Sequence, residues 1–525
     1  MQMNRFTSLS LSSLCSVVVS AGSLFAAAQP GDDLQAILDS GSDLELQPNT
    51  VYEIKETLRY KADGQKISTI GAQGIETYAT LRLVDTETPQ LIHNHAMDNI
   101  VLEKVILDGN RYELSNMPSE SPRKWHPLVQ FGGPDANNQT AQDCVFIAPR
   151  TWSTLKLHEG ATGLVARNNI FIGAGTGPRG NGRDLREQAF DWGDGITCAA
   201  EGGIIVNNLI LDPTDVGIVA FGAPGTQIRE NTIATISRES LGGINLVDAL
   251  GVYEMDDKEG YFSYLGTVVE DNLLDAFGGR IHIAFPIGAS PWVPNNAHKI
   301  LYGGTVRNNH LSGLAGGYGY VAHGIDGFTI EGNTTDAKFS GLGDGLNRQL
   351  RPVPAAPFLF DSRTIGDSKL QSEFVAADTK LEHLLRCNHG PRDATGYRVY
   401  PYGKYEAQGV VLAAFVEMLA RTPTEEESHY WVNYLGATKD TADNLRRTLM
   451  TTQEFQALHG YINPNKLHTF RNELWFQTLS QVLGGRSLNQ MSSKELYMQA
   501  KAALQTPDNR KNLILSGQSI PELED

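Results

Sequence analysis

The chain contains 525 residues, of which 53 are Gly and 20% are charged, and its formal net charge is -17. This length exceeds one ordinary globular domain, unless the chain forms a repeat structure that grows along one axis. The net charge excludes a nucleic-acid partner bound through a general basic surface, but it does not exclude an acidic polysaccharide held in a local cationic groove.

The segment from Met1 to Ala28 is predicted to be a secretory signal peptide. Arg5 supplies an early positive charge, residues 9–25 are mostly apolar or small, and three alanines at 26–28 offer a cleavage site. The protein is therefore expected to be secreted, either extracellular or periplasmic. No later apolar run reaches the roughly 18 residues of a membrane-spanning helix. The remaining cysteines are odd in number, so one thiol stays unpaired in a monomer, and pairing is left open among Cys144, Cys198 and Cys387.

A short helix and then strands are predicted after the signal. Residues 33–38 have helical periodicity and would cover the open end of a solenoid, and residues 66–71 and 79–83 alternate as strands. Together with the run from Val105 to Arg111, this opening resembles the pectate-lyase-like right-handed parallel β-helix superfamily. The resemblance covers roughly residues 30–345 and implies an all-β solenoid. It leaves the chemistry open, because lyases, hydrolases, epimerases and phage tailspikes share these motifs.

The strand pattern lapses between residues 112 and 145, where four prolines stand in a polar stretch. We expect a long loop there, which either borders a binding groove or packs on the flank of the coil.

A sequence pattern repeats between residues 191 and 336. Each repeat contains a glycine, a run of branched apolar residues, and an asparagine beside another apolar pair. The asparagines follow one another at steps of 23, 41, 37 and 24 residues, at Asn208, Asn231, Asn272, Asn309 and Asn333. The short steps match one coil of a three-strand parallel β-helix, and the long steps include loops outside the coil. Because coils stack about 4.8 Å apart, we expect these asparagines to form an internal hydrogen-bonded ladder.

The predicted organisation is a signal peptide at 1–28, a parallel β-helix at 29–345, a linker with short helices at 346–404, and an α-helical domain at 405–525. Within the last region, Thr424 is the expected N-cap of a helix that begins with acidic residues. Residues 418–455 resemble a small helical domain of unknown function found on secreted bacterial proteins. Tyr430 and Trp431 are interpreted there as core residues rather than as a sugar-stacking surface.

Outward-facing polar residues are predicted by aligning the inward apolar positions of successive coils, since strand side chains alternate. The inward positions are Ile196, Ile218, Ile244, Ile281 and Val321. The alignment gathers one face of polar residues, to which we assign catalytic roles for His282, Arg280, Tyr318 and Tyr320 and substrate-binding roles for Asp215 and Asn245. Further substrate-binding candidates are Asp194, one register position away, Lys156 and His158, outward on an earlier strand whose face the alignment leaves open, and Asp248 and Trp292, at or in the loops that would flank the face.

Three functions compete for this site. A polysaccharide lyase or C5-epimerase acting on uronate chains would use His282 or a tyrosine to move the proton next to the carboxylate, with Arg280 stabilising the charge. A glycoside hydrolase would use paired carboxylates, for which Asp194 and Asp215 are candidates. A noncatalytic polysaccharide-binding or surface-adhesion solenoid is the third. The expected partner is a polysaccharide; no cofactor or metal motif is identified, Ca²⁺ binding stays open, and so does the oligomeric state.

Overall fold

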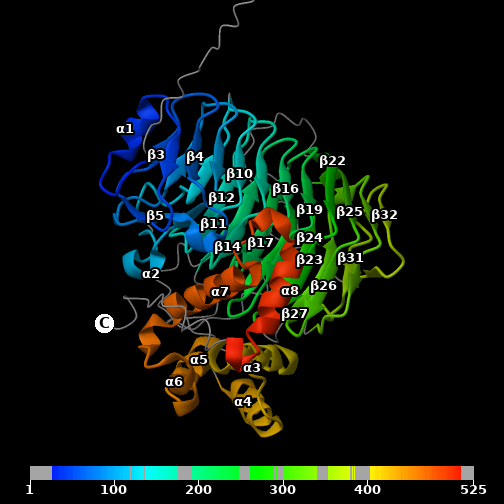
Figure 1. Cartoon of the computed structure of the whole chain (residues 1–525). Coiled ribbons are helices and arrows are strands. Elements are labelled where there is room, and N and C mark those ends of the chain that lie inside the picture. The colour runs from blue at the N-terminus through cyan, green and yellow to red at the C-terminus, as the bar shows by residue number, and fades with distance from the viewer. Residues whose placement is uncertain are drawn as a thin grey trace, which may run out of the picture.

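The computed structural model describes residues 27–118, 120–134, 136–175, 192–247, 261–288, 291, 300–339, 353–378, 381, 384, 402–438 and 440–509. Over these ranges the chain winds into a right-handed parallel β-helix, and C-terminal helices pack against one side of it (Figure 1). The expected all-β solenoid with a smaller all-α region is confirmed. Most of the predicted signal peptide, residues 1–26, lies outside the described residues.

Each coil supplies one strand to each of three parallel sheets, here named sheets A, B and C. Sheet A contains β1 (Leu44–Leu46), β4 (Lys66–Thr69), β7 (Val101–Glu103), β10 (Thr140–Gln142), β13 (Val165–Arg167), β16 (Ile204–Val206), β19 (Gln227–Arg229), β22 (Tyr261–Glu270), β25 (Ile300–Arg307), β29 (Thr329–Glu331) and β32 (Lys369–Leu370), with β28 (Ile325–Asp326) beside β25. Sheet B contains β2 (Val51–Ile54), β5 (Ala79–Leu83), β8 (Val105–Asp108), β11 (Val145–Ile147), β14 (Ile170–Ile172), β17 (Leu209–Leu211), β20 (Thr232–Ala234), β23 (Leu273–Ala276), β26 (His310–Gly313) and β30 (Thr334–Thr335). Sheet C contains β3 (Leu58–Arg59), β6 (Ile92–His93), β9 (Val129–Phe131), β12 (Ser153–Leu157), β15 (Asp194–Cys198), β18 (Val216–Phe221), β21 (Ser240–Val247), β24 (Ile281–Ile287), β27 (Gly316–Ala322), β31 (Phe358–Phe360) and β33 (Val375–Ala376).

The interior of the coil is filled by apolar side chains that stack from one coil to the next. Phe146 stacks on Phe171 with ring centroids 4.6 Å apart, and Phe285, Tyr320 and Phe358 form a second stack at 4.5 and 4.8 Å. The N-terminal end is covered by α1 (Leu34–Asp39), as predicted, and Asp33 caps that helix. Stacking of like side chains in register favours the repeated pattern that the sequence shows.

The predicted asparagine ladder is present at the corner between sheets A and B. In each step the Nδ2 of one asparagine donates to the Oδ1 of the next, at 2.9 to 3.0 Å, through Asn169, Asn208, Asn231, Asn272, Asn309 and Asn333. Gln371 accepts from Asn333 at 3.2 Å and continues the ladder by one more coil. The ladder also provides hydrogen bonds to buried main-chain carbonyl oxygens, because each Nδ2 donates to one of them as well.

Replacing Asn231 by Ala is expected to lower the free energy of unfolding by about 2–3 kcal/mol, because buried partners in the adjacent coils lose their hydrogen bonds. Asn231 accepts from Asn208 and donates to both Asn272 and the Ile205 carbonyl. Urea unfolding followed by circular dichroism measures the change. Asn433→Ala, on the exposed surface of a helix, is the matched control. Equal stability of the two variants would contradict a stabilising ladder.

The C-terminal helices cover the outer face of sheet B (Figure 1). They are α3 (Lys404–Leu419), α4 (Glu425–Ala437), α5 (Ala442–Met450), α6 (Gln453–His459), α7 (Leu467–Leu483) and α8 (Ser493–Ala503). Sheet B is therefore apolar on both faces: in β14, Phe171 lies in the coil, whereas Ile170 and Ile172 pack against the helices. Such a strand has a continuous apolar run rather than alternation.

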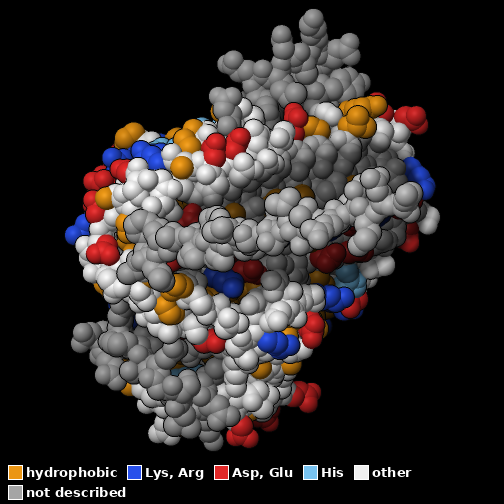
Figure 2. Space-filling model, turned by 45° about the horizontal axis from the view of Figure 1, so that its top comes forward, with side chains coloured by type: hydrophobic (Ala, Val, Ile, Leu, Met, Phe, Trp, Pro, Cys, Tyr) orange, Lys and Arg blue, Asp and Glu red, His pale blue; other side chains and the backbone are white. Residues whose placement is uncertain are grey.

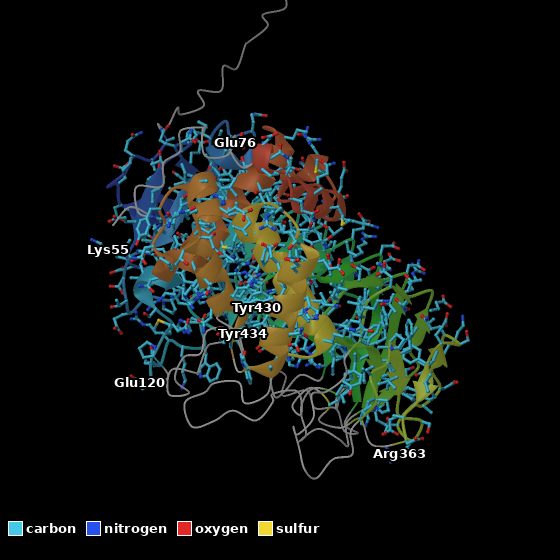
Figure 3. All side chains as sticks on the ribbon, turned by 90° about the horizontal axis from the view of Figure 1, so that it is seen from below. Lys55, Glu76, Glu120, Arg363, Tyr430 and Tyr434 are labelled. Carbon is cyan, nitrogen blue, oxygen red and sulfur yellow. The ribbon has the colours of Figure 1, made fainter. Side chains whose placement is uncertain are left out.

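Helix α4 begins as predicted but presents an unexpected surface. Thr424 caps it and exchanges hydrogen bonds with Glu427. The interpretation of its aromatic residues as core is wrong for Tyr430, which is 59% exposed, and Tyr434 lies parallel to it (Figure 3). Leu435 supplies the buried side of α4 instead.

Two predicted irregular regions contain strands. The stretch 112–145 includes β9 and β10, which pair with strands of the neighbouring coils. The coil also extends beyond residue 345, because β31, β32 and β33 pair with β27, β29 and β31. The short helix expected near residues 374–386 is replaced at its start by β33. These strands are only two or three residues long, too short to show a period in the sequence.

Candidate active site on the outer face of sheet C

A line of outward-facing residues crosses seven neighbouring strands of sheet C in register. It contains, in order, Arg59, His93, Gln130, Lys156, Thr197, Val219 and Asn245. We call this line the outer stripe. At about 4.8 Å per coil it is about 29 Å long. The stripe places Lys156 and Asn245, both predicted to bind substrate, in one row.

The first half of the outer stripe carries a cluster of imidazoles. The rings of His93 and His95 lie 4.7 Å apart, and those of His95 and His158 lie 5.0 Å apart. Gln130 Nε2 lies 2.9 Å from His95 Nε2, and Lys156 Nζ and His158 Nδ1 lie 3.6 and 3.2 Å from Glu159 Oε2.

Burial lowers the pKa of each of these imidazoles. For His93 the pKa falls to about 3, with the charge of Arg59 as the second cause. The pKa values of His95 and His158 are also lowered, first by burial and then by neighbouring positive groups that include Lys156, although Glu159 opposes the effect. The imidazoles are therefore neutral at pH 7 and able to accept protons. Neither His93 nor His95 was predicted: β6 (Ile92–His93) is two residues long, and His95 lies in the bend after it, so no strand alternation signals their position.

A pair of carboxyl groups lies beside the middle of the outer stripe. Asp194 is 3% exposed, and its Oδ2 accepts a hydrogen bond of 2.7 Å from Thr197 Oγ1, which itself lies 2.7 Å from Ser153 Oγ. Asp215, on the next coil, is half-buried. One oxygen of each carboxyl group, Oδ1, is buried without a hydrogen-bond partner among the described residues.

Both carboxyl groups are poised to hold a proton. Burial, and then the charge of Asp215, raises the pKa of Asp194 well above its usual range. Burial raises the pKa of Asp215 to about 7. Two buried acids that interact cannot both ionise without cost, so at neutral pH the pair retains a proton. The proton belongs to the pair as a whole, so the two groups titrate together.

A local irregularity at Gly195 turns Asp194 outward. Ile196 lies in the coil interior and Thr197 outside it, so strict alternation would place Asp194 inside as well. Instead Gly195 also faces inward, where a Cβ atom would approach the Gly217 carbonyl oxygen at 2.6 Å and Ile210 at 2.7 Å. A side chain larger than glycine does not fit, and Gly217 repeats this arrangement on the next coil.

Asn245 completes the candidate site at the far end of the stripe. Its side chain is buried, yet neither amide atom has a hydrogen-bond partner within the described part of the chain. Gly242 lies directly against it, since a Cβ atom there would come within 2.1 Å of Asn245 Oδ1. An unsatisfied buried amide and two unsatisfied carboxyl oxygens on neighbouring coils can bind hydroxyl groups of a ligand.

The predicted catalytic tyrosines do not lie on the stripe. Tyr320 points into the coil, where it stacks between Phe285 and Phe358, so its assignment to an exposed row is wrong. Tyr318 faces outward, but it is buried and its hydroxyl donates to the Val353 carbonyl at 2.6 Å. Neither ring is placed to exchange a proton with a polysaccharide.

Arg280 and His282 are also placed differently from the prediction. His282 is fully buried with its Nε2 3.1 Å from Glu239 Oε2, and Arg280 is 2% exposed and lies 4.0 Å from Glu406 of α3. The alignment of Ile281 with Ile244 was wrong by four residues, because Ser240 pairs with Ile281 and Leu246 with Ile287. The neighbour of Asn245 is therefore at position 286. Asp248 and Trp292 lie outside the described residues.

The described ranges also bear on metal sites, membrane-spanning helices and free thiols. They contain no group of three or more His, Cys, Asp or Glu side chains placed to bind one metal ion. No helix there is long and apolar enough to cross a membrane. Cys144 and Cys198 are buried free thiols. On the face drawn in Figure 2, acidic and basic side chains are interspersed, with no continuous basic surface among the described residues.

The fold and the outer stripe define a parallel β-helix protein with a polar row along one sheet. No protein-family model and no curated protein matches the sequence. The structure is similar to that of the tailspike protein of E. coli bacteriophage HK620 in complex with a pentasaccharide, with a TM-score of 0.42 and 11% identity over 66% of this chain and 62% of the tailspike. A mutant of that tailspike in complex with a hexasaccharide gives 0.42 and 12% over 66% and 62%. The chain thus spans 62% of the length of these tailspikes, and the likeness concerns the fold alone.

Proposed function

We propose that this protein is a secreted carbohydrate-active enzyme that binds a polysaccharide along the outer stripe and hydrolyses it. The observation that carries the proposal is the Asp194–Asp215 pair, whose interacting carboxyl groups have raised pKa values and unsatisfied oxygens next to the stripe. Perturbed acids that gather at one place on a surface for binding are typical of catalytic sites.

Hydrolysis assigns a separate role to each carboxyl group. Asp194 holds its proton at neutral pH and would donate it to the glycosidic oxygen as the bond to the anomeric carbon breaks. Asp215, once ionised, would either activate a water molecule or attack the anomeric carbon directly, depending on the separation of the two groups. Thr197 donates to Asp194 Oδ2, so the proton that Asp194 would give is carried by Oδ1, which has no hydrogen-bond partner among the described residues.

The charge on the stripe favours an acidic polysaccharide, such as a uronate-containing chain. Arg59 and Lys156 supply cations in the first half of the stripe, and the neutral imidazoles between them supply hydrogen-bond donors and acceptors. The part of the stripe that reaches solvent runs from Arg59 to Lys156 and is about 14 Å long, whereas Thr197, Val219 and Asn245 beyond it are buried. A local cationic row of this kind is compatible with the overall negative charge.

A second candidate is a polysaccharide lyase or C5-epimerase, favoured by the neutral His158 beside Lys156. A neutral imidazole can take the proton next to a uronate carboxylate, and a nearby ammonium group stabilises the enolate-like charge that develops. This candidate moves the proposed base from His282, which is bonded to Glu239, to His158, which lies beside the stripe.

Product analysis distinguishes these functions. The full chain is incubated with polygalacturonate, alginate, hyaluronan and a neutral glucan, and three signals are followed. We expect reducing ends to appear without ultraviolet absorbance, as hydrolysis requires. Unsaturated ends that absorb in the ultraviolet would replace this proposal by the lyase, and altered uronate stereochemistry in the NMR spectrum of an intact chain would indicate the epimerase. Binding with no chemical change would leave a noncatalytic polysaccharide-binding solenoid.

A further inference from the structure

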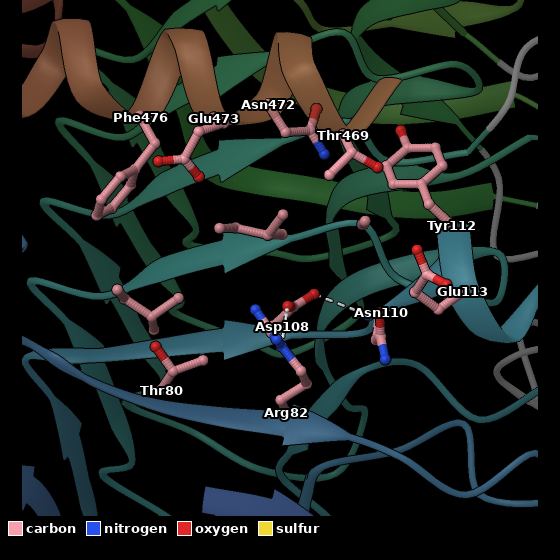
Figure 4. A pocket seen from close by; sticks show the side chains of 13 residues that line it. Thr80, Arg82, Asp108, Asn110, Tyr112, Glu113, Thr469, Asn472, Glu473 and Phe476 are labelled. Carbon is pink, nitrogen blue, oxygen red and sulfur yellow. Dashed lines mark hydrogen bonds and ion pairs between the residues drawn. The ribbon is translucent and has the colours of Figure 1, made fainter. Parts of the chain in front are cut away.

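A cavity lies away from the outer stripe, between α7 and the first coils of sheet B (Figure 4). It has a volume of about 220 Å³ and is open to the surface on one side. Its walls come from β5, β8 and β11, from the segment around α2 (Arg111–Leu114), and from the face of α7 that looks toward the sheet. We call it the junction cavity.

The lining of the junction cavity combines an apolar floor with neutral polar groups. Ile106 and Ile147 form the floor, and Phe476 of α7 closes one end with its ring (Figure 4). Five neutral polar side chains line it. Asn110 donates to the Leu83 carbonyl and Tyr112 accepts from Arg111. The other three, Thr80, Thr469 and Asn472, have no hydrogen-bond partner among the described residues. An apolar surface with a few convergent polar groups is the usual composition of a small-molecule site.

The charged groups around the junction cavity are already paired. Arg82 Nε donates to Asp108 Oδ2 at 2.9 Å, Lys466 Nζ lies 3.0 Å from Glu113 Oε1, and Gln477 donates to Glu473 at 2.7 Å. An anionic ligand would therefore meet the carboxylates of Asp108, Glu113 and Glu473, and the basic groups beside them in the described part of the chain are already in ion pairs. The groups that stay available are hydroxyls and an amide, which bind neutral donors and acceptors.

We propose that the junction cavity binds one neutral sugar ring, independently of the site on sheet C. A sugar presents hydroxyls, which match Thr80, Thr469 and Asn472, and an apolar face, which matches Phe476. The volume of about 220 Å³ is below the roughly 300–1,000 Å³ of pockets for larger ligands, so the cavity fits a single ring and not a chain. The helical region thereby holds a glycan end or side branch beside the coil.

The test measures binding of glucose, galactose, mannose and N-acetylglucosamine to the full chain by saturation-transfer NMR and calorimetry. Glucuronate and spermidine serve as anionic and cationic probes. We expect one neutral sugar to bind, Asn472→Leu to weaken it at least tenfold, and Thr80→Phe, which fills the cavity, to abolish it. Asp194→Asn should leave this affinity unchanged, which separates this site from the proposed catalytic one.

Three results would overturn the proposal: no neutral sugar binds, a charged probe binds more tightly than every neutral sugar, or Thr80→Phe binds as well as the original chain. Circular dichroism melting confirms that each variant is folded. If Thr80→Phe does not fold, Thr469→Phe fills the same cavity from α7. If the original chain binds a neutral sugar but hydrolyses no glycan, that result counts against the catalytic proposal alone.

Discussion

Replacing Asp194 by Asn is expected to reduce glycan hydrolysis by about 10²- to 10⁴-fold, the usual contribution of a general acid. An amide has nearly the same shape and can still accept the hydrogen bond from Thr197, but it has no proton to give to the leaving oxygen. Because the pKa of Asp194 is raised well above its usual range, the folded protein already holds a neutral group there. The unfolded state, whose pKa is close to 3.8, loses this proton at pH 7, so a neutral amide removes the cost of taking it up on folding, and the free energy of unfolding should rise at pH 7.

Asp215 predicts the pH dependence of the same reaction. It acts in the ionised form and its pKa is raised to about 7, so the rate of hydrolysis should rise as the pH increases through about 7. The effect on stability has the opposite sign. The folded state holds this proton more tightly than the unfolded state, whose pKa is close to 3.8, so the free energy of unfolding contributed by Asp215 falls between about pH 4 and pH 7. Asp215→Asn should remove both dependences.

Initial rates from reducing-end assays and urea unfolding at several pH values measure these effects. Asp378→Asn is the matched control, because this residue is exposed. It should change neither the rate nor its pH profile. Full activity of Asp194→Asn would show that the carboxyl pair is not the catalytic acid and base, whichever product the enzyme forms.

The parts of the fold that could be predicted are those in which one residue type makes a characteristic hydrogen bond, either repeated from coil to coil or local in the sequence. Asn208 and Asn231 recur because only a side chain with both a donor and an acceptor can bond its own copy on the next coil, and the ladder follows from their spacing. Thr424 was likewise identifiable as a helix cap, because its bond to the Glu427 amide is local in sequence.

The candidate site was harder to predict because sheet C is buried on both faces over its later coils. In β24, Ile281 and Phe285 lie in the coil, whereas Ile283 packs outside it against Tyr318. A strand of this kind has no alternation, so the register of Ile281 could not be read from its apolar residues. The irregularity at Gly195 is the second reason, since it reverses the side on which Asp194 lies. On the earlier strand β12, which does alternate at Leu155, Lys156 and Leu157, the outward position of Lys156 was predicted correctly.

Replacing Arg471 by Ala is expected to lower the free energy of unfolding by about 3–5 kcal/mol, because it removes a buried cation that two buried carboxylates share. Arg471 Nη2 lies 2.6 Å from Glu417 Oε1 and 2.9 Å from Asp212 Oδ2. Glu417 also accepts from Arg446 at 2.7 Å and from Trp475 at 3.0 Å, and all of these groups are buried. The network joins α3, α5 and α7 to the turn after β17 of the coil.

The pKa of Glu417 gives this network a dependence on acid. Burial by itself would raise that pKa, but Arg471 and Arg446 hold it at about 2. A carboxyl group with a lowered pKa stabilises the fold at pH values above its unfolded pKa of about 4.5, and this contribution is lost as the pH falls toward 2. Arg471→Ala should therefore lose most stability near neutral pH and little near pH 2. Urea titrations at both pH values measure the difference.

The same substitution tests whether the helices and the coil unfold together. Arg471 is on α7 and Asp212 is in the coil, so the helices cannot leave sheet B without exposing Asp212 and the apolar side of β14 and β17. We expect one cooperative transition that moves to lower urea concentration as a whole, detected equally by tryptophan fluorescence and by circular dichroism. Arg229→Ala removes an arginine that has no ion pair among the described residues, and it should not move the transition. Two separated transitions in the original chain would show instead that the helical region is an independent unit, in which case the ion pairs between Arg471 and Asp212 contribute to docking and not to folding.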